Sequence, residues 1–218
     1  MNAATAMFPQ GLPGWFGKLP GMGDFAHRRL PETFRTPWDA WLQSGLTGLR
    51  QRHDDWTERY LESPLWSFVL GERVIGPSRW VGVLMPSVDG VGRYFPFALV
   101  SEITVPQEDA LRGEALAQVR RWWTRGTQAA LDGLENDLDA TRFDAALQAL
   151  FGATDVDEAD EVTDDICLLP AAGQSLWLTH PDGSAGWRMR GAGLPSSQRF
   201  DALFGFATED SADRVEIQ

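Results

Sequence analysis

The residues with the clearest chemical potential lie in the segment 14–31, GWFGKLPGMGDFAHRRLP. Residues 21–26, GMGDFA, match the dinucleotide-binding spacing G-x-G-x-x-A, in which glycines let the backbone approach a pyrophosphate at a helix N-terminus. Such a site needs a buried strand before the first glycine and a long helix after it. Here Pro20 precedes the first glycine, and Pro31 would end a helix within two turns. The pattern therefore predicts a rigid turn, and we expect no cofactor in it.

Other catalytic patterns are also missing from the sequence. Lys18 is followed by leucine, whereas a Walker loop has a hydroxyl side chain there for magnesium. The histidines, at 27, 53 and 180, lack metal-binding spacing, and acidic neighbours of Cys167, the only cysteine, oppose thiolate formation. A catalytic pair of carboxylates that are distant in sequence but close in the folded structure remains an open alternative. We expect no catalytic residue, no metal and no enzymatic activity.

Positive side chains cluster in this segment, although the chain has a formal net charge of −12. They are Lys18, His27, Arg28 and Arg29. The two arginines either form part of a docking surface for another protein or pair with the protein's own excess carboxylates, and both interpretations stay open. In an alternative from a different class, Lys18, Arg28, Arg29 and the glycine turns of 17–29 hold a phosphate ligand, in a sensor or an enzyme.

The chain contains ten tryptophans. Trp122 and Trp123 are consecutive and would point about 100° apart around a helix, and Trp38 and Trp41 are three residues apart. Either these helices are enclosed over a wide arc and all the rings are core, or some of the rings face a partner. The second interpretation is open because tryptophan and arginine are common in interface hot spots.

Charge and composition limit the classes of partner and compartment. Acidic side chains outnumber basic ones 31 to 19, so most of the surface repels polyphosphate, and we expect no nucleic acid. The run 155–165, DVDEADEVTDD, lacks the glycine and final glutamate of a calcium loop, and we predict a solvated acidic loop over 153–165. Apolar stretches stay well below the roughly 18 residues of a membrane span. Residues 1–10 do not resemble a secretory signal, so we expect the cytoplasm and no membrane insertion.

Hydrophobic periodicity predicts helices on both sides of a strand-rich centre. A long amphipathic helix is predicted over 36–62, with Thr36 as its cap and Pro37 at its first helical position. The later predicted helices are 108–134, 141–151 and one that begins after Ser196 or Ser197. The predicted strands, of which the first three are apolar on both faces, are 65–70, 79–85, 93–103, 174–180 and 185–190.

An order of helix, strands, helices, strands and helix suits an α/β fold. Short turns between residues 65 and 103 favour antiparallel neighbours, because a parallel pair needs a longer crossover. We therefore predict a single domain over 14–206, with a central, largely antiparallel or mixed sheet flanked by helices on both faces. Residues 1–13 and 207–218 are predicted to be tails.

Four motifs cover residues 14–99 densely. They are GWFGKLPGMGDFAHRRLP at 14–31, PWDAWL at 37–42, SPLWSF at 63–68 and GVLMPSVDGVGRYFPFAL at 82–99. Together, and in this order, they resemble the TagF (ImpM) family of type VI secretion-associated proteins. The later SLWLT and GLPSSQRFDALF are also similar to the family, so the resemblance runs to about residue 205. The acidic loop and the last residues carry none of it.

The resemblance implies a cytoplasmic, non-enzymatic accessory protein of a bacterial contractile injection apparatus, with one α/β domain. It also implies a post-translational repressor of type VI secretion that acts beside a threonine kinase and phosphatase pathway and binds an FHA-domain scaffold protein. Some relatives are fused to a PP2C-type phosphatase domain, which we expect to be a separate protein here. The family offers no accepted catalytic residues.

The family motifs and the positive cluster supply the candidate partner-binding residues. These are Lys18, Asp24, Arg28, Arg29, Trp38, Asp39, Trp41, Asp89 and Arg93. Repression by sequestration needs an interface and no chemistry, and a micromolar complex, about 8 kcal/mol, is within reach of a standard interface with a few aromatic anchors. A structural part of the secretion apparatus is a further alternative.

Overall fold

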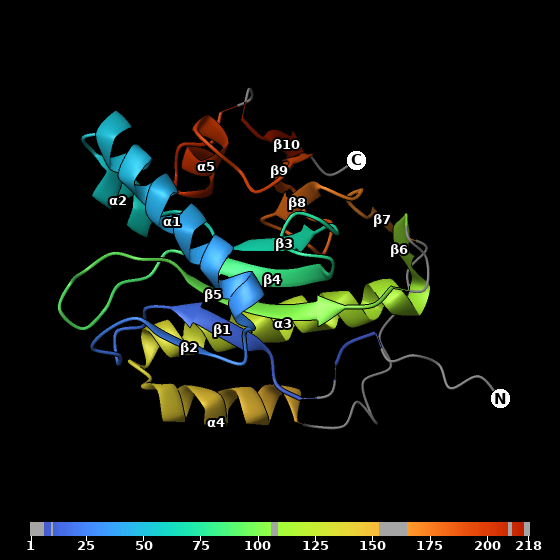
Figure 1. The fold of residues 1–218 in the computed structure, drawn as a ribbon, viewed down its shortest axis with the longest axis horizontal. Coiled ribbons are helices and arrows are strands. Elements are labelled where there is room, and N and C mark those ends of the chain that lie inside the picture. Colours follow the sequence, from blue (N-terminus) through green and yellow to red (C-terminus); the bar gives the residue numbers. More distant parts are fainter. Residues whose placement is uncertain (1–6, 10, 106–108, 153–164, 209–210, 216–218) are drawn as a thin grey trace.

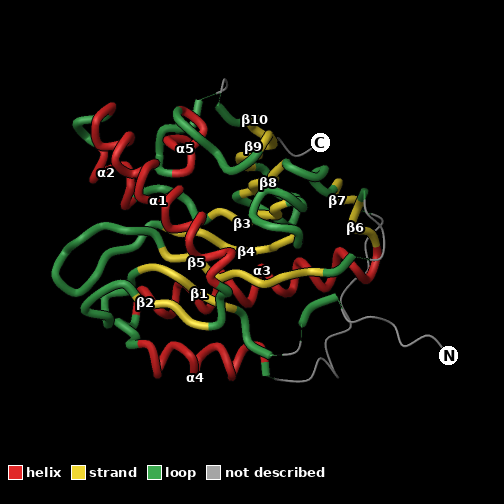
Figure 2. Tube along the Cα trace, in the orientation of Figure 1, coloured by secondary structure: helices red, strands yellow, loops and turns green. Residues whose placement is uncertain are grey.

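The computed structural model describes residues 7–9, 11–105, 109–152, 165–208 and 211–215, and it shows a sheet between two layers of helices (Figures 1 and 2). The main sheet has eight strands, and neighbouring strands in it are antiparallel. From edge to edge they are β10 (Asp213–Val215), β9 (Gly186–Ala192), β8 (Gln174–Leu178), β3 (Trp66–Leu70), β4 (Arg79–Met85), β5 (Phe97–Ile103), β1 (Gly14–Gly17) and β2 (Ala26–Arg28). The predicted α/β fold, with an antiparallel sheet flanked on both faces, is confirmed.

The three strands β3, β4 and β5 are buried on both faces, as their uninterrupted apolar sequences predict. Successive side chains of a strand point to opposite faces, so β4 places Val83 in one core and Leu84 in the other. Each core therefore has the sheet as one wall and a layer of helices as the other.

One face of the sheet is covered by α1 (Glu32–Arg52), α2 (Trp56–Leu61) and α5 (Gln198–Leu203) (Figure 1). Aromatic rings fill this core. Trp38 of α1 stacks on Trp177 of β8 with 6.4 Å between ring centroids, and it lies 5.3 Å from Phe68 of β3. Large rings bury much apolar area each, so this layer is held chiefly by aromatic packing.

The start of the first helix differs from its prediction over 36–62. Pro31 occupies the N-cap with extended backbone angles, so α1 begins before Thr36, its predicted cap. Pro37 lies inside α1, where its missing N–H removes one hydrogen bond from the helix. The predicted start at Thr36 and Pro37 is therefore wrong by about one turn.

The end of that helix also differs, because two helices stand where one was predicted. The chain leaves the helical conformation at His53, and α2 begins separately at Trp56. At this break, Arg52 binds both oxygens of Asp201 on α5, at 2.6 and 2.7 Å, and His53 lies 3.0 Å from the same carboxylate. A contact with a residue so distant in sequence gives no signal in local periodicity.

The other face is covered by α3 (Gly113–Glu135) and α4 (Ala140–Phe151) (Figure 1). Trp122 and Trp123 of α3 are both buried, and Phe8 stacks on Trp122 with 6.2 Å between centroids. The helix is thus enclosed over a wide arc, which favours the core interpretation of this pair.

Neither α3 nor α1, the two long helices of the described chain, has a stretch apolar enough to cross a lipid bilayer.

The second long helix begins later than its prediction from residue 108. Residues Ala110–Arg112 form strand β6, which pairs with β7 (Ile166–Leu168) in a separate two-stranded sheet. Leu111 is therefore buried from a strand and not from a helix. An apolar residue buried in a short strand is indistinguishable from the first turn of a helix by periodicity alone.

The predicted tails contribute to the folded structure. Met7 is buried and Phe8 packs on α3, although both lie in the predicted tail 1–13. Within the predicted tail 207–218, β10 pairs with β9 and extends the sheet by one strand. The acidic loop predicted over 153–165 lies outside the described residues, apart from Asp165.

We predict that Gly45→Ala destabilises the protein while Gly126→Ala stabilises it. A Cβ at position 45 of α1 would lie 2.1 Å from the ring of Phe200, so α5 would have to shift, at a cost of about 1–3 kcal/mol. A Cβ at position 126 of α3 would lie 3.4 Å from Trp122, an ordinary contact, and alanine gains up to about 1 kcal/mol over glycine within a helix. Urea denaturation measures both changes. A Gly45→Ala variant as stable as the original protein would contradict the close packing of α1 on α5.

Candidate functional site

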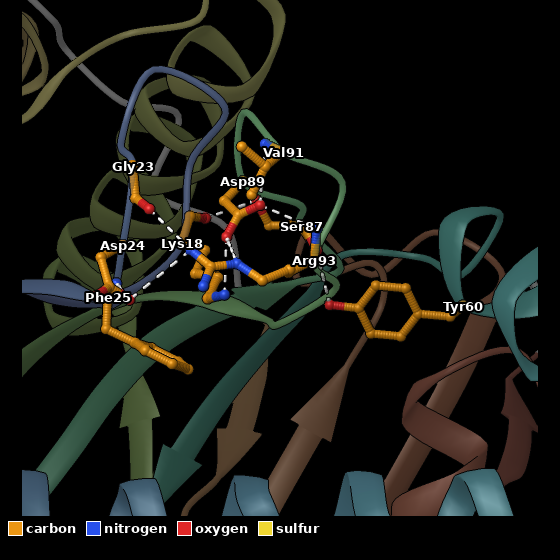
Figure 3. A network of polar contacts seen from close by, with 9 residues as sticks. All are labelled: Lys18, Gly23, Asp24, Phe25, Tyr60, Ser87, Asp89, Val91 and Arg93. Atoms are coloured by element: carbon orange, nitrogen blue, oxygen red, sulfur yellow. Dashed lines mark hydrogen bonds and ion pairs between the residues drawn. The ribbon is translucent and has the colours of Figure 1, made fainter.

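Two loops meet at one end of the sheet, where Figure 3 shows their polar contacts. The first, residues 18–25, connects β1 to β2, and the second, residues 86–96, connects β4 to β5. Because β1 and β5 are antiparallel neighbours, the segment after β1 and the segment before β5 lie at the same end. Sheet topology therefore places together two loops that are distant in sequence.

The glycine pattern at 21–26 is explained by packing. The residues after it enter strand β2 and not a helix, so the strand–turn–helix arrangement of a dinucleotide site is not formed. A Cβ on Gly21 would lie 2.1 Å from the carbonyl oxygen of Asp137, between α3 and α4. Glycine is needed there because two backbones approach closely.

Asp89 carries the central carboxylate of the site, and its side chain is fully buried. Its Oδ2 accepts hydrogen bonds from Nζ of Lys18 at 2.8 Å and from Nε of Arg93 at 2.7 Å. Its Oδ1 accepts from the backbone N–H groups of Val91 at 3.1 Å and of Arg93 at 2.9 Å. Four donors thus satisfy this carboxylate within the protein.

Burial raises the pKa of the Asp89 carboxyl, but the hydrogen bonds from Lys18, Arg93 and Val91 outweigh it and hold that pKa well below its usual range. Asp89 is therefore charged at neutral pH, and it faces the buried ammonium group of Lys18. Removing one partner of a buried ion pair is far more costly than the pair's net contribution. The two residues consequently depend on each other and set the conformation of both loops.

Further hydrogen bonds join the loops to each other and to the helical layer (Figure 3). Arg93 donates from its guanidinium to the carbonyl oxygen of Gly23 at 2.8 Å, which links the two loops. Ser87 donates from its hydroxyl to the carbonyl oxygen of Lys18 at 2.6 Å. Tyr60 of α2 donates to the carbonyl oxygen of Ser87 at 3.1 Å and accepts from its N–H at 3.0 Å. The backbone of both loops is held by this network.

Two apolar side chains stand exposed on these loops. Phe25 is 46% exposed and Val91 is 73% exposed, whereas large apolar side chains are mostly buried. The ring of Phe25 lies 4.5 Å from Nζ of Lys18, a cation–π contact that helps to orient the ring. Asp24 and Arg93 are exposed beside them. We call Asp24, Phe25, Val91 and Arg93 the two-loop surface.

Arg28 and Arg29 bind Asp144 of α4, away from the two-loop surface. Arg29 reaches both carboxylate oxygens of Asp144, at 2.7 and 3.1 Å, and Arg28 binds one of them. Trp15 donates from Nε1 to the same carboxylate at 3.0 Å. Burial raises the pKa of Asp144, but these donors outweigh it and lower the pKa to about 2. The structure thus favours pairing of the arginines with one of the protein's own carboxylates.

The three candidates on α1 lie outside the two-loop surface. Trp38 is fully buried among aromatic rings, so the structure corrects its prediction as a partner-binding residue. Trp41 is half-buried and donates from Nε1 to the carbonyl oxygen of Pro195 at 2.6 Å. Asp39 accepts hydrogen bonds from Gln43, one turn later on the same helix, at 2.9 Å.

Of the nine predicted residues, the structure brings four together at the loops: Lys18, Asp24, Asp89 and Arg93. The prediction missed the two exposed apolar residues and the two hydroxyl groups that brace the loops: Phe25, Val91, Ser87 and Tyr60. A large apolar residue among turn-forming glycines was the available signal for the first two. The hydroxyl contacts gave no signal, because their partners are far apart in sequence.

The structure argues against the alternative in which Lys18, Arg28 and Arg29 hold a phosphate ligand, because all three cations already have carboxylate partners. Lys18 is buried against Asp89, and both arginines are bound to Asp144, so a phosphate would have to displace a carboxylate. Within the described residues, His, Cys, Asp and Glu side chains form no group of three or more that could hold a metal ion.

We predict that Asp144→Asn destabilises the protein at pH 7 by about 2 kcal/mol, because the carboxyl pKa falls from its ordinary 3.8 to about 2 on folding. A lowered pKa stabilises the fold above the unfolded-state pKa, and this contribution is lost as the pH falls from about 4 to about 2. The difference in unfolding free energy between variant and original protein should therefore shrink over that range in urea titrations. A difference that stays constant from pH 7 to pH 2 would contradict the role of Asp144. Asp39→Asn is the control, because this half-buried carboxylate has only Gln43 as a side-chain partner among the described residues.

Comparison with known proteins identifies the family to which this fold belongs. A family model described as TagF N-terminal domain, type VI secretion system-associated, matches residues 14–150, more than half of the chain and including both loops. The crystal structure of PA0076 from Pseudomonas aeruginosa PAO1 is similar, with a TM-score of 0.68 and 28% sequence identity, and the match covers 90% of this chain and 96% of that chain. No curated protein matches the chain. The chain therefore belongs to the TagF family of type VI secretion system-associated proteins.

Proposed function

We propose that this protein acts in the cytoplasm as a post-translational repressor of type VI secretion, by binding another protein of the apparatus and without catalysing a reaction. The observation that carries the proposal is the two-loop surface, in which Phe25 and Val91 are exposed on loops whose backbone is held by buried hydrogen bonds. Apolar side chains on a rigid backbone lose little entropy on binding, so more of their contact energy becomes affinity.

The polar groups beneath this surface support binding rather than chemistry. The carboxylate of Asp89 has four donors within the protein, and Lys18 is used to neutralise it. A general acid or base needs a carboxyl or amine that is free to exchange a proton with a substrate. The same two loops carry the exposed charges of Asp24 and Arg93, 4.0 Å apart, which suits the polar part of an interface.

The partner we propose is the FHA-domain scaffold protein that the family resemblance implies, with a threonine kinase and a PP2C-type phosphatase acting on the same pathway. Sequestration of this scaffold needs a complex of micromolar affinity or tighter, about 8 kcal/mol. One or two apolar anchors at the centre of an interface supply a large part of such a binding energy.

We predict that Val91→Asp and Phe25→Ser each weaken binding of the FHA-domain scaffold by about tenfold or more, because each removes an apolar anchor. Purified scaffold and variant protein are compared by isothermal calorimetry, and secretion is measured in cells that carry each variant. We expect weaker binding together with increased secretion. Val91 is 73% exposed, so its substitution leaves the core intact.

The matched control is Leu61→Ser on α2, which changes an apolar residue that is 51% exposed but lies outside the two loops. It should bind the scaffold as the original protein does. Original affinity in both loop variants would contradict the two-loop surface as the binding site. Recovery of the protein only with the assembled apparatus, and never with free scaffold, would instead identify a structural component.

A further inference from the structure

A groove of about 410 Å³ is lined chiefly by residues of β7, β8 and β9. Figure 1 shows β6 and β7 on the opposite side of the molecule from the loop between β4 and β5. Register places Leu176 opposite Arg190 and Leu178 opposite Arg188, so these four side chains share one face of the sheet. Leu176 and Leu178 belong to the core on the α3 side, which identifies that face. The floor of the groove is therefore an end of the sheet that carries two arginines, with β7 as a side wall.

Among the described residues, no strand pairs with the edge of β7 that faces this groove. The N–H of Leu169 donates to the carbonyl oxygen of Asp109 at 2.9 Å, on the side of β6. Backbone groups of a strand alternate in direction, so those of Leu168 and Ile166 point away from β6. Arg190 donates to the carbonyl oxygen of Leu168 at 2.6 Å and to that of Leu169 at 3.1 Å. The Leu168 carbonyl is therefore occupied, and the N–H of Leu168 and the backbone groups of Ile166 remain on this edge. An unpaired edge is a template for a strand from another chain.

The side chains along that edge are apolar and exposed. Ile166 is 52% exposed and Leu168 is 58% exposed, and because they are two residues apart they share one side of β7. Cys167 points to the opposite side, where it packs against the core. An added strand would thus meet apolar side chains on its outer side and the floor of the groove on its inner side.

The groove is basic in a strongly acidic chain. Arg120 of α3, Arg188 and Arg190 line it, and all three act on the thiol of Cys167, whose pKa burial raises and their charges lower. Two described acidic residues lie at the groove: Asp165, which pairs with Arg120 at 2.9 Å, and Asp213, which stands opposite Arg188 in β10.

We propose that an extended acidic segment of a partner protein adds to the free edge of β7 as a strand. Its backbone pairs with Ile166 and with the N–H of Leu168, its apolar side chains lie beside these two residues, and its alternate carboxylates face Arg188. Charge complementarity selects the occupant, because an acidic segment is repelled by most of a chain with a net charge of −12 and attracted here. This surface is separate from the two-loop surface and does not rest on the proposed function.

The test uses the full-length protein and a fluorescein-labelled peptide of alternating valine and glutamate, with binding followed by fluorescence anisotropy. We expect saturable binding that Arg188→Glu weakens by about tenfold or more. The side chain of Arg188 is exposed and makes no hydrogen bond or ion pair among the described side chains. Because glutamate would stand opposite Asp213, a like charge, the variant is compared in melting and in binding with Arg188→Gln, which should also weaken binding but without this repulsion. Arg142→Glu, the same charge reversal at an exposed position of α4, should leave the affinity within about twofold of the original.

Two altered peptides separate strand addition from simple charge attraction. Lysine in place of glutamate should abolish binding, and N-methylation of alternate residues should abolish it by removing the donors that pair with β7. Equal binding of the N-methylated peptide, an equal loss with Arg142→Glu, or no binding of the original peptide would each overturn the proposal. A concentration-dependent dimer that Arg188→Glu abolishes would also overturn it, since a second copy would then be the occupant. Val91→Asp should bind the peptide normally, which distinguishes failure here from failure of the two-loop surface.

Discussion

The structure depends on the burial of β3, β4 and β5 on both of their faces. An apolar strand with no solvent face requires cover on two sides, and the chain supplies it with α1, α2 and α5 on one side and α3 and α4 on the other. Both faces of the central sheet are then closed to a partner. Exposed side chains on a well-held backbone are left at the ends and edges of the sheet, which is where both proposed surfaces lie.

At one end, the carboxylate of Asp89 organises what is exposed. A buried charge is tolerated only when it is paired and hydrogen-bonded, and Lys18, Arg93 and Val91 meet that requirement from two loops. The same contacts that neutralise Asp89 also restrict the loop backbone. The exposed ring of Phe25 is therefore held by a rigid loop backbone. The hydrogen bonds that neutralise Asp89 below the surface thus fix the exposed residues in place before a partner binds.

Near β8 and β9, the helices cover the sheet incompletely, and a groove results. The α3 side of β8 and β9 carries Arg188 and Arg190 beside the small sheet of β6 and β7, and the described residues leave a groove between them. Proteins usually protect free strand edges with short strands, charge or overlying elements. Here β7 is short and arginines stand beside it, but Ile166 and Leu168 remain exposed on it, which leaves an edge suited to selective pairing.

The sequence by itself determined the elements whose character depends on neighbouring residues. The first two central strands, the helix near 141–151 and the hairpin of β8 and β9 follow their predicted positions closely, because a run of apolar side chains or its period is a local property. The third central strand, predicted over 93–103, begins only at Phe97, because residues 93–96 belong to the loop around Asp89. Helix ends were predicted less well: Pro37 was expected at the first helical position, but α1 begins at Glu32 with Pro31 as its N-cap. Only the tertiary structure decided which side chains meet. Lys18 and Asp89 are 71 residues apart, and Arg29 and Asp144 are 115 apart, so these pairs form only because the sheet and helices bring their segments together. Tertiary packing also decided that Trp38 is buried and Phe25 is exposed.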